Sequence, residues 1–264
     1  MKSTLSRLLF RAALLVGAWG CLPACANTAE LPEITAYTDE RPPYSFSAQG
    51  QVKGIAADLL TGACQDAGLL CRIQVVPWAR GYAMALSRPN TLVFAAVRRP
   101  DREALFQWIG PIMPRSIWVW VRNDALQRTG GSTQLKDYRF GIVRGNASLP
   151  DLQAAGVPAG SISIESSQAA LQRLLERGWI DAVIGTELAM NWTGRTARDS
   201  AAPMTRLTKL SDEGAYHYAL STKTDPRVVD RLQASIDKLR RNGSLDEIMK
   251  RYSQREPAAT PLKP

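Results

Sequence analysis

The pattern of hydrophobic and polar positions switches repeatedly between two periods along the chain. Short runs rich in β-branched and aromatic residues, such as 33–39 and 91–97, are typical of strands. Segments with apolar residues three and four positions apart, such as 55–68 with its closing Gly68, are typical of helices. Because strands and helices alternate, the sequence predicts an α/β fold with largely parallel sheets.

The two periods assign an element to most of the chain after residue 32. Strands are expected at 33–39, 71–77, 91–97, 117–123, 137–145, 161–165, 180–185 and 216–221. Helices are expected at 55–68, 78–87, 148–156, 166–178, 186–192, 226–243 and 244–254. Two comparable strand-helix cycles predict two lobes, and a cleft between lobes is a common place for a small ligand.

The first 26 residues have a different pattern. Three basic residues precede an apolar run at 12–19, and the small-residue triplet Ala24-Cys25-Ala26 follows. This order is typical of a secretory signal peptide cleaved after Ala26, and the apolar run is too short to span a bilayer. The alternative is a lipoprotein signal with acylation at Cys25. We therefore expect an exported, periplasmic protein.

Charge argues against a nucleic-acid partner. The 264-residue chain carries 33 basic and 24 acidic residues, and loss of residues 1–26 leaves 30 against 24, a net charge of +6. This excess is scattered, with no long Lys/Arg tract and no aromatic-interleaved basic motif, so we expect no nucleic-acid binding. His217 is the only histidine, so we expect no metal site and no cofactor.

Two cysteines remain after removal of the signal peptide. Cys64 lies near the end of a predicted helix and Cys71 opens the following strand. In an oxidising compartment the two are expected to form a disulfide that joins the helix end to the strand. The alternative is a pair of free buried thiols.

Six short motifs along the mature chain form a recognisable series. They are RPPYSF at 41–46, GIAADL at 54–59, RPDREALFQWIGP at 99–111, FGIVRGNAS at 140–148, GWIDAVIG at 178–185 and LRRNGSLDEIMKRY at 239–252. In this order and spacing they resemble the bacterial extracellular solute-binding proteins of family 3, the polar amino-acid receptors of ABC importers.

The resemblance implies a periplasmic-binding-protein-like fold of type II. Lobe 1 would comprise 27–112 plus 216–256 and lobe 2 would comprise 113–215, with two hinge crossings and a disordered tail at 257–264. It also implies a monomeric receptor that closes on an anionic or zwitterionic, amino-acid-like solute with a carboxylate. The partners would be the membrane subunits of an ABC transporter.

Arg102 matches the arginine with which such receptors hold the ligand carboxylate, since a planar guanidinium donates two hydrogen bonds to a carboxylate. The alternative for Arg102 is a surface salt bridge with Asp101 or Glu103. Val97 stands where the family usually has Ser or Thr, so the motif lacks one hydroxyl. Arg98 is a candidate to replace this hydroxyl with a charge.

Thr186 matches the position of the aspartate that pairs with the α-ammonium group of the ligand. Threonine cannot neutralise a buried ammonium, and an unpaired buried charge is costly. Two alternatives follow: either the adjacent Glu187 takes this role, or the ligand has no free α-amino group. Glu187 is also interpretable as an exposed first-turn residue.

The remaining candidate ligand contacts lie in loops. The resemblance implies that Tyr44 and Phe46 stack on the ligand, with Trp78 at the same rim. Asn146 follows a glycine turn where a helix begins, so its backbone N–H could bind a carboxylate.

Two other function classes stay open. The fold also resembles that of periplasmic cyclohexadienyl dehydratases, in which a cleft carboxylate is the general acid; Glu187, with a pKa raised by burial, would take that role. A sensor or accessory binding protein without a transporter is the third class. We expect the receptor and no enzymatic activity.

Overall fold

A computed structural model describes residues 33–196, 203–212 and 214–254. The chain divides into a unit Met1–Glu30 and a unit Leu31–Pro264, and all described residues belong to the second. The predicted signal peptide, with Cys25, and the predicted tail 257–264 lie outside the described residues. Within the described part, no helix has the length and apolar character needed to cross a membrane.

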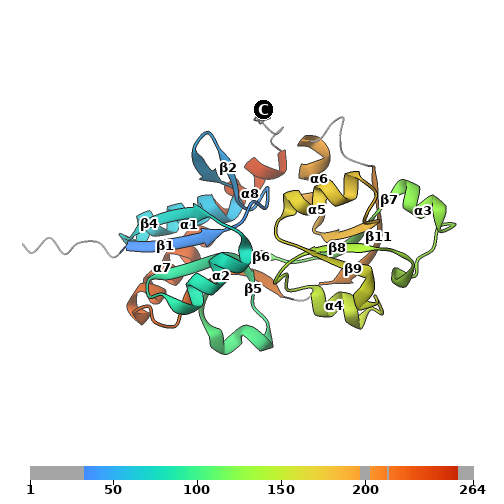
Figure 1. The fold of residues 1–264 in the computed structure, drawn as a ribbon. Helices are drawn as coiled ribbons and strands as arrows, with labels where there is room; N and C mark the ends of the chain where they lie inside the picture. The colour runs from blue at the N-terminus through green and yellow to red at the C-terminus, as the bar shows by residue number, and fades with distance from the viewer. Residues whose placement is uncertain (1–32, 197–202, 213, 255–264) are drawn as a thin grey trace, which may run out of the picture. The chain divides into compact units, whose positions relative to one another are not determined.

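The first sheet has the strand order β4-β1-β5-β12-β6 (Figure 1). Its strands are β1 (Glu33–Thr38), β4 (Leu70–Val75), β5 (Thr91–Val97), β6 (Phe106–Pro114) and β12 (Ala215–Ser221). The pairs of β1 with β4 and with β5 are parallel, whereas β12 is antiparallel to β5 and β6. The sheet therefore combines strands from the start of the chain with one from near its end.

Helices cover both faces of this sheet (Figure 1). They are α1 (Ile55–Ala67), α2 (Trp78–Ser87), α7 (Pro226–Arg241) and α8 (Ser244–Gln254), and a hairpin of β2 (Phe46–Ala48) and β3 (Gln51–Lys53) precedes α1. Alternate residues of β5 point to opposite faces. Leu92 and Phe94 pack with α1 and α7, whereas Val93 packs in the cluster that contains Trp78 and Ala85 of α2. Alternate residues of β5 therefore pack against helices on opposite faces, and the sheet lies between two helix layers.

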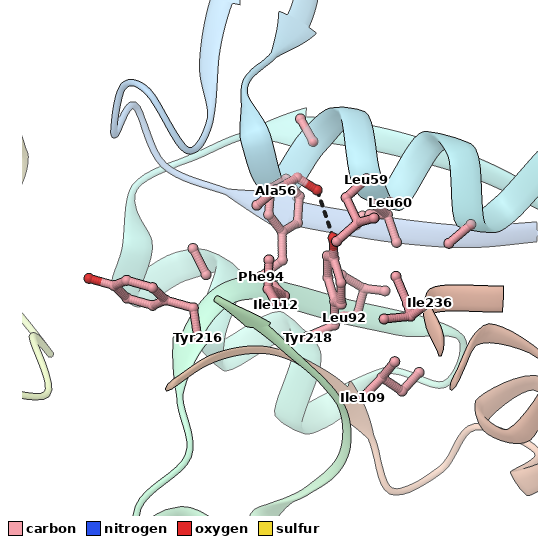
Figure 2. Close-up of a cluster of buried hydrophobic side chains, with 14 of the residues drawn as sticks. Ala56, Leu59, Leu60, Leu92, Phe94, Ile109, Ile112, Tyr216, Tyr218 and Ile236 are labelled. Carbon is pink, nitrogen blue, oxygen red and sulfur yellow. Dashed lines mark hydrogen bonds between the residues drawn. The ribbon is translucent and has the colours of Figure 1, made fainter. Parts of the chain in front are cut away.

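Figure 2 shows the larger of these clusters. Leu59 and Leu60 of α1, Ile236 of α7 and Phe94 of β5 all belong to it, and the four residues are at most 1% exposed. The hydroxyl group of buried Tyr218 donates to the carbonyl oxygen of Ala56 at 2.8 Å, which satisfies the only polar atom of that side chain.

The second sheet has the order β11-β7-β10-β8-β9. Its strands are β7 (Ile117–Arg122), β8 (Phe140–Val143), β9 (Ile162–Glu165), β10 (Ala182–Gly185) and β11 (Met204–Ser211), with helices α3 (Asn123–Arg128), α4 (Leu149–Ala154), α5 (Gln168–Glu176) and α6 (Glu187–Thr196). Short 3₁₀ turns are η1 (Pro100–Leu105), η2 (Leu135–Asp137) and η3 (Ala159–Ser161). The chain enters this sheet after β6 and leaves it before β12, so the fold is the predicted two-lobed α/β class.

Three features of the fold differ from the sequence prediction. The strands β6 and β11 lie in segments to which the sequence pattern assigned no element, and the β2-β3 hairpin lies in a segment without a predicted strand. Strand β6 contains Gly110 and Pro111, which normally interrupt strands; the register with β12 shifts at these residues, and β12 pairs with β6 on both sides of them. Pairing with β12, a strand distant in the sequence, decides that this segment is a strand. The local sequence pattern does not predict this pairing.

The predicted disulfide is present. Cys64 near the end of α1 and Cys71 in β4 are joined, with their Cα atoms 6.1 Å apart. The bridge joins a helix end to the adjacent strand, as their sequence positions predicted.

Asp181, in the GWIDAVIG motif, is a buried structural anion. Its carboxylate accepts from Arg128 at 2.6 Å, from the guanidinium of Arg139 at 2.8 and 2.9 Å, and from the backbone N–H of Arg139 at 3.0 Å. Burial alone would raise its pKa, but the hydrogen bonds from Arg139 and Arg128 outweigh burial and lower the pKa to about 2. The carboxylate thus anchors the start of β10 to the segments that contain Arg128 and Arg139.

Replacing Asp181 by asparagine is expected to lower the free energy of unfolding at pH 7 by about 1–3 kcal/mol, since charge-assisted hydrogen bonds are lost. The folded-state pKa is below the unfolded value of about 3.9, so the stabilisation is complete above that pH and disappears as the pH falls through about 2. Urea unfolding at pH 7, 4 and 2.5 measures this. Exposed Asp230→Asn is the matched control; a difference between wild type and Asp181→Asn that stays constant with pH would contradict the assignment.

Candidate functional site

A cavity of about 540 Å³ is lined by residues of both lobes. From the first lobe come the loop after β1, the start of α2, the end of β5 and η1. From the second lobe come the turn 145–148, one side of α5 and the junction of β10 with α6. The carboxyl ends of β1, β5, β8 and β10 all reach it, as expected for ligand sites in open α/β sheets.

Arg102 lines the cavity, in agreement with its predicted place in the cleft. Its Nη2 donates to the carbonyl oxygen of Gly145 at 3.0 Å, and its Cζ lies 5.4 Å from the ring centroid of Tyr82. Within the described part of the chain, no carboxylate forms an ion pair with it, so the predicted alternatives Asp101 and Glu103 are not its partners. The remaining guanidinium donors of Arg102 are available to an anion.

Arg41 is a second cavity arginine, which the sequence prediction missed. Its Nη2 pairs with Asp39 at 3.1 Å, and its Cζ lies 5.2 Å from the ring centroid of Trp78. Burial opposes the charge of Arg41, but Asp39 and the nearby Tyr216 outweigh burial and raise its pKa. It stays charged at any physiological pH. Arg41 is the first residue of the RPPYSF motif, so its place in the motif was the available signal.

Arg115 is the third cavity arginine and was also missed. It lies between β6 and β7, and only 2% of its side chain is exposed. Its Nη2 donates to the hydroxyl of Ser148 and lies 3.4 Å from Oδ2 of Asp151, and its Nη1 lies 3.5 Å from the hydroxyl of Ser211. These partners come from two segments of the second lobe, the start of α4 and the end of β11, so the position of Arg115 near a hinge was its only sequence signal.

Tyr44 and Thr186 meet across the cavity. Their hydroxyl groups form a short hydrogen bond although the residues are 142 positions apart. The hydroxyl of Thr186 also accepts from the backbone N–H of Ala189 at 3.2 Å, which caps the start of α6. Burial first, and then the nearby Tyr216, raise the pKa of Tyr44, so its phenol group stays neutral.

Three of the predicted ligand contacts lie outside the cavity lining, which corrects those expectations. Phe46 packs on Trp192, with ring centroids 5.3 Å apart, because the β2-β3 hairpin carries it toward α6 and α8. The guanidinium of Arg98 is exposed and pairs with Glu103, with Nε 2.7 Å from Oε2. Arg98 therefore does not replace the missing hydroxyl at Val97.

Glu187 is the third correction. Its side chain is 51% exposed and pairs with Arg206 of β11. Helix α6 begins at Glu187, and its first turn directs this residue away from the cavity that Thr186 lines. The expectation of a buried carboxyl group at Glu187 is therefore not met, and the general-acid role depended on that burial.

The turn 145–148 lines the cavity from the second lobe, opposite the arginine of η1. Asn146 lines the cavity as predicted, but its side-chain oxygen accepts from the backbone N–H of Ser148 at 2.9 Å. The carbonyl oxygen of Gly145 accepts from Arg102 and, at 3.3 Å, from the indole N–H of Trp78. Trp78 thus lines the cavity as a hydrogen-bonded rim residue.

Arg99 also bridges the two lobes. Its Nη1 donates to the carbonyl oxygen of Ala147 and to Oδ1 of Asp151, both at 3.0 Å. Asp151 also pairs with Arg115. One carboxylate therefore links Arg99, the N-cap residue of η1, with Arg115, which lies between β6 and β7. The RRPDR segment therefore contributes two lobe-bridging residues, Arg99 and Arg102, of which Arg102 also lines the cavity.

The side chains of this cavity are suited to hydrogen bonding with an anion rather than to metal binding. No group of three or more His, Cys, Asp and Glu side chains that could hold a metal ion occurs among the described residues. The guanidinium groups of Arg41, Arg102 and Arg115 are of a kind that donates hydrogen bonds to a carboxylate. Tyr44 and Tyr216 contribute neutral hydroxyl groups to the lining.

Comparisons with known proteins agree with this geometry. The model of the bacterial extracellular solute-binding proteins, family 3, matches residues 34–255, whereas a search of curated proteins gives no match. The fold is similar to that of the arginine-, lysine-, histidine-binding protein ArtJ from Geobacillus stearothermophilus, at 16% identity and a TM-score of 0.72, covering 85% of this chain and 96% of that one.

Two further solved structures are similar. One is an amino acid ABC transporter substrate-binding protein from Streptococcus pneumoniae bound to L-arginine, with 15% identity, a TM-score of 0.70 and coverage of 84% and 94%. The other is a Salmonella typhimurium periplasmic binding protein with high arginine specificity, with 16% identity, a TM-score of 0.69 and coverage of 83% and 98%. Since the family model spans most of the chain, this protein belongs to the bacterial extracellular solute-binding proteins, family 3.

Proposed function

We propose that this protein is a monomeric periplasmic receptor that captures a small solute with a carboxylate by lobe closure and delivers it to an ABC importer. The lobes would comprise 27–112 plus 216–256 and 113–215. The observation that carries the proposal is Arg102: a cavity-lining guanidinium with no ion-pair partner in the described part of the chain.

Contacts between the lobes support capture by closure. Arg99, Arg102 and Trp78 of the first lobe donate to backbone carbonyl oxygens of the turn 145–148, and Tyr44 bonds Thr186. A solute that contacts both lobes would make its full set of contacts only when the lobes are closed around it. Binding would therefore favour the closed form, which a transporter can distinguish from the open form.

The relatives support the transport role. The Streptococcus pneumoniae protein is part of an amino acid ABC transporter, and the others bind basic amino acids. At 14–16% identity the fold is shared, while the ligand of this protein depends on its own cavity residues.

A thermal-shift screen of amino acids, dicarboxylates, opines and related acids tests the proposal. A solute present at 100 times its dissociation constant adds about 2.7 kcal/mol to stability, which is easily seen. Arg102→Met is expected to weaken binding of the active solute at least tenfold, whereas Arg98→Met, which removes an exposed arginine of the same segment, is the matched control.

Two results would contradict the receptor role. One is that no solute of the screen shifts the melting temperature. The other is that the Arg98 and Arg102 variants weaken binding equally. The transport step is tested separately: uptake of the active solute is expected to fall in cells that lack the protein.

A further inference from the structure

The charged groups that line the cavity are unevenly placed. Among the described residues they are three arginines, Arg41, Arg102 and Arg115, and two glutamates, Glu40 and Glu176. Arg115 is buried and the other two arginines are half-buried, whereas both glutamates are exposed. Positive charge therefore faces the enclosed part of the cavity, and negative charge stands at its edges.

The two glutamates at the edges of the cavity, Glu40 and Glu176, already accept hydrogen bonds from neighbouring residues. The carboxylate of Glu40 accepts from the backbone N–H of Ser47 at 3.1 Å and from its hydroxyl group, which directs it toward the β2-β3 hairpin. Glu176 accepts from the side-chain amide of Gln172 at 3.0 Å on the exposed side of α5. Each of the two carboxylates is also solvated, so neither is a strong partner for a charge inside the cavity.

Two further carboxylates, buried Asp39 and half-buried Asp151, pair with arginines near the cavity. Asp39 contacts Arg41, and its second oxygen, Oδ1, is inaccessible. Asp151 contacts both Arg99 and Arg115. Neither aspartate is a cavity-lining residue, whereas Arg41 and Arg115 are, so each aspartate neutralises a cavity arginine without itself offering a carboxylate to the cavity.

The rest of the cavity wall is uncharged. Thr186 and Tyr44 bond to each other, and the raised pKa of Tyr44 keeps its phenol neutral. Farther along α5, β10 and α6, the lining consists mainly of apolar side chains, with glutamines at the solvent side. The apolar ones are Leu171, Leu175, Val183, Ile184 and Met190.

We infer that this cavity takes an organic acid whose enclosed part has a carboxylate and an uncharged body but no ammonium group. This inference rests on the proposed receptor function and differs from the amino acids that the relatives bind. An enclosed ammonium group would face guanidinium groups and neutral hydroxyls, and burial of a charge without a counter-charge is strongly unfavourable. Glu187 is exposed and pairs with Arg206, so it is not placed to neutralise an ammonium group in the cavity.

Titration calorimetry with matched pairs of ligands tests the inference on the purified protein. The members of each pair differ only in the α-ammonium group: hexanoate and L-norleucine, 3-phenylpropanoate and L-phenylalanine, glutarate and L-glutamate. We expect at least one acid to bind at least tenfold more tightly than its amino-acid counterpart, a difference of about 1.4 kcal/mol.

The possible outcomes separate this inference from the receptor role. If the amino acid binds as tightly as the acid or more tightly in a pair, the inference is wrong and the receptor role stands. If no member of any pair binds at 10 mM, the inference is wrong for acids of this size. The receptor role is then judged by the broader thermal-shift screen alone.

Two variants of Thr186 isolate the effect of charge. Asp and Asn have almost the same size, and both cap helices well, so the cap at Ala189 is retained in Thr186→Asp and Thr186→Asn. Compared with Thr186→Asn, Thr186→Asp is expected to bind the acids at least tenfold more weakly and the amino acids more tightly. Equal affinities of the two variants for both ligand classes would show that this wall does not set the charge preference.

Discussion

Replacing Arg115 by methionine is expected to lower the free energy of unfolding by about 3–5 kcal/mol, or the melting temperature by on the order of 10 °C. The buried guanidinium contacts Ser148, Asp151 and Ser211. Methionine has a similar length but no donors, so it leaves Asp151 with Arg99 as its remaining arginine partner. Urea unfolding and thermal melting at pH 7 measure the loss.

Arg115→Lys is the matched variant, because it keeps the charge but loses the planar set of donors. We expect it to retain part of the stability and to bind the active acid more weakly than wild type. A methionine variant that melts within 2 °C of wild type would mean that the buried charge contributes no net stability. A methionine variant that binds the acid normally would remove Arg115 from the binding site.

Replacing Gly54 by alanine is expected to destabilise the protein by about 3–5 kcal/mol and to disturb the binding site. Gly54 precedes α1 with φ at +125°. A Cβ atom there would lie 2.7 Å from the backbone nitrogen of Ser45 and still closer to the carbonyl group of Tyr44. Backbone atoms cannot rotate away, so either α1 or the loop that positions Tyr44 must move.

Gly50→Ala is the matched control for Gly54→Ala. Gly50 also has a positive φ, +74°, but a Cβ atom there would have no neighbour within 4 Å. Its substitution should cost only the backbone strain, about 1 kcal/mol. Thermal melting of both variants separates strain from collision, and equal losses would show that the approach of Tyr44 does not constrain Gly54.

Local patterns predicted the parts of the fold that depend on local forces. Apolar spacing predicted α1, α2, α5 and α7, because burying one face of a helix requires that spacing whatever the partner is. Two remaining cysteines predicted the bridge between Cys64 and Cys71. Strand β6 was missed because its pairing with β12 outweighs the Gly110-Pro111 sequence that normally ends a strand.

The site residues divide in the same way. Arg102, Tyr44, Trp78, Asn146 and Thr186 line the cavity at the places where the motif series put them. The roles of Arg98 and Glu187 were wrong because each has a carboxylate or guanidinium partner that the sequence does not reveal: Glu103 for the first and Arg206, from another strand, for the second.

The sequence by itself determined the α/β class, the family and the position of one cavity arginine. Only the tertiary structure decided which charges line the cavity and which carboxylates pair with its arginines without lining it. The pairs Thr186 with Tyr44, Arg115 with Asp151 and Glu187 with Arg206 join distant segments. The energy of a charge depends on its burial and on its nearest counter-charge, and both are properties of the folded chain.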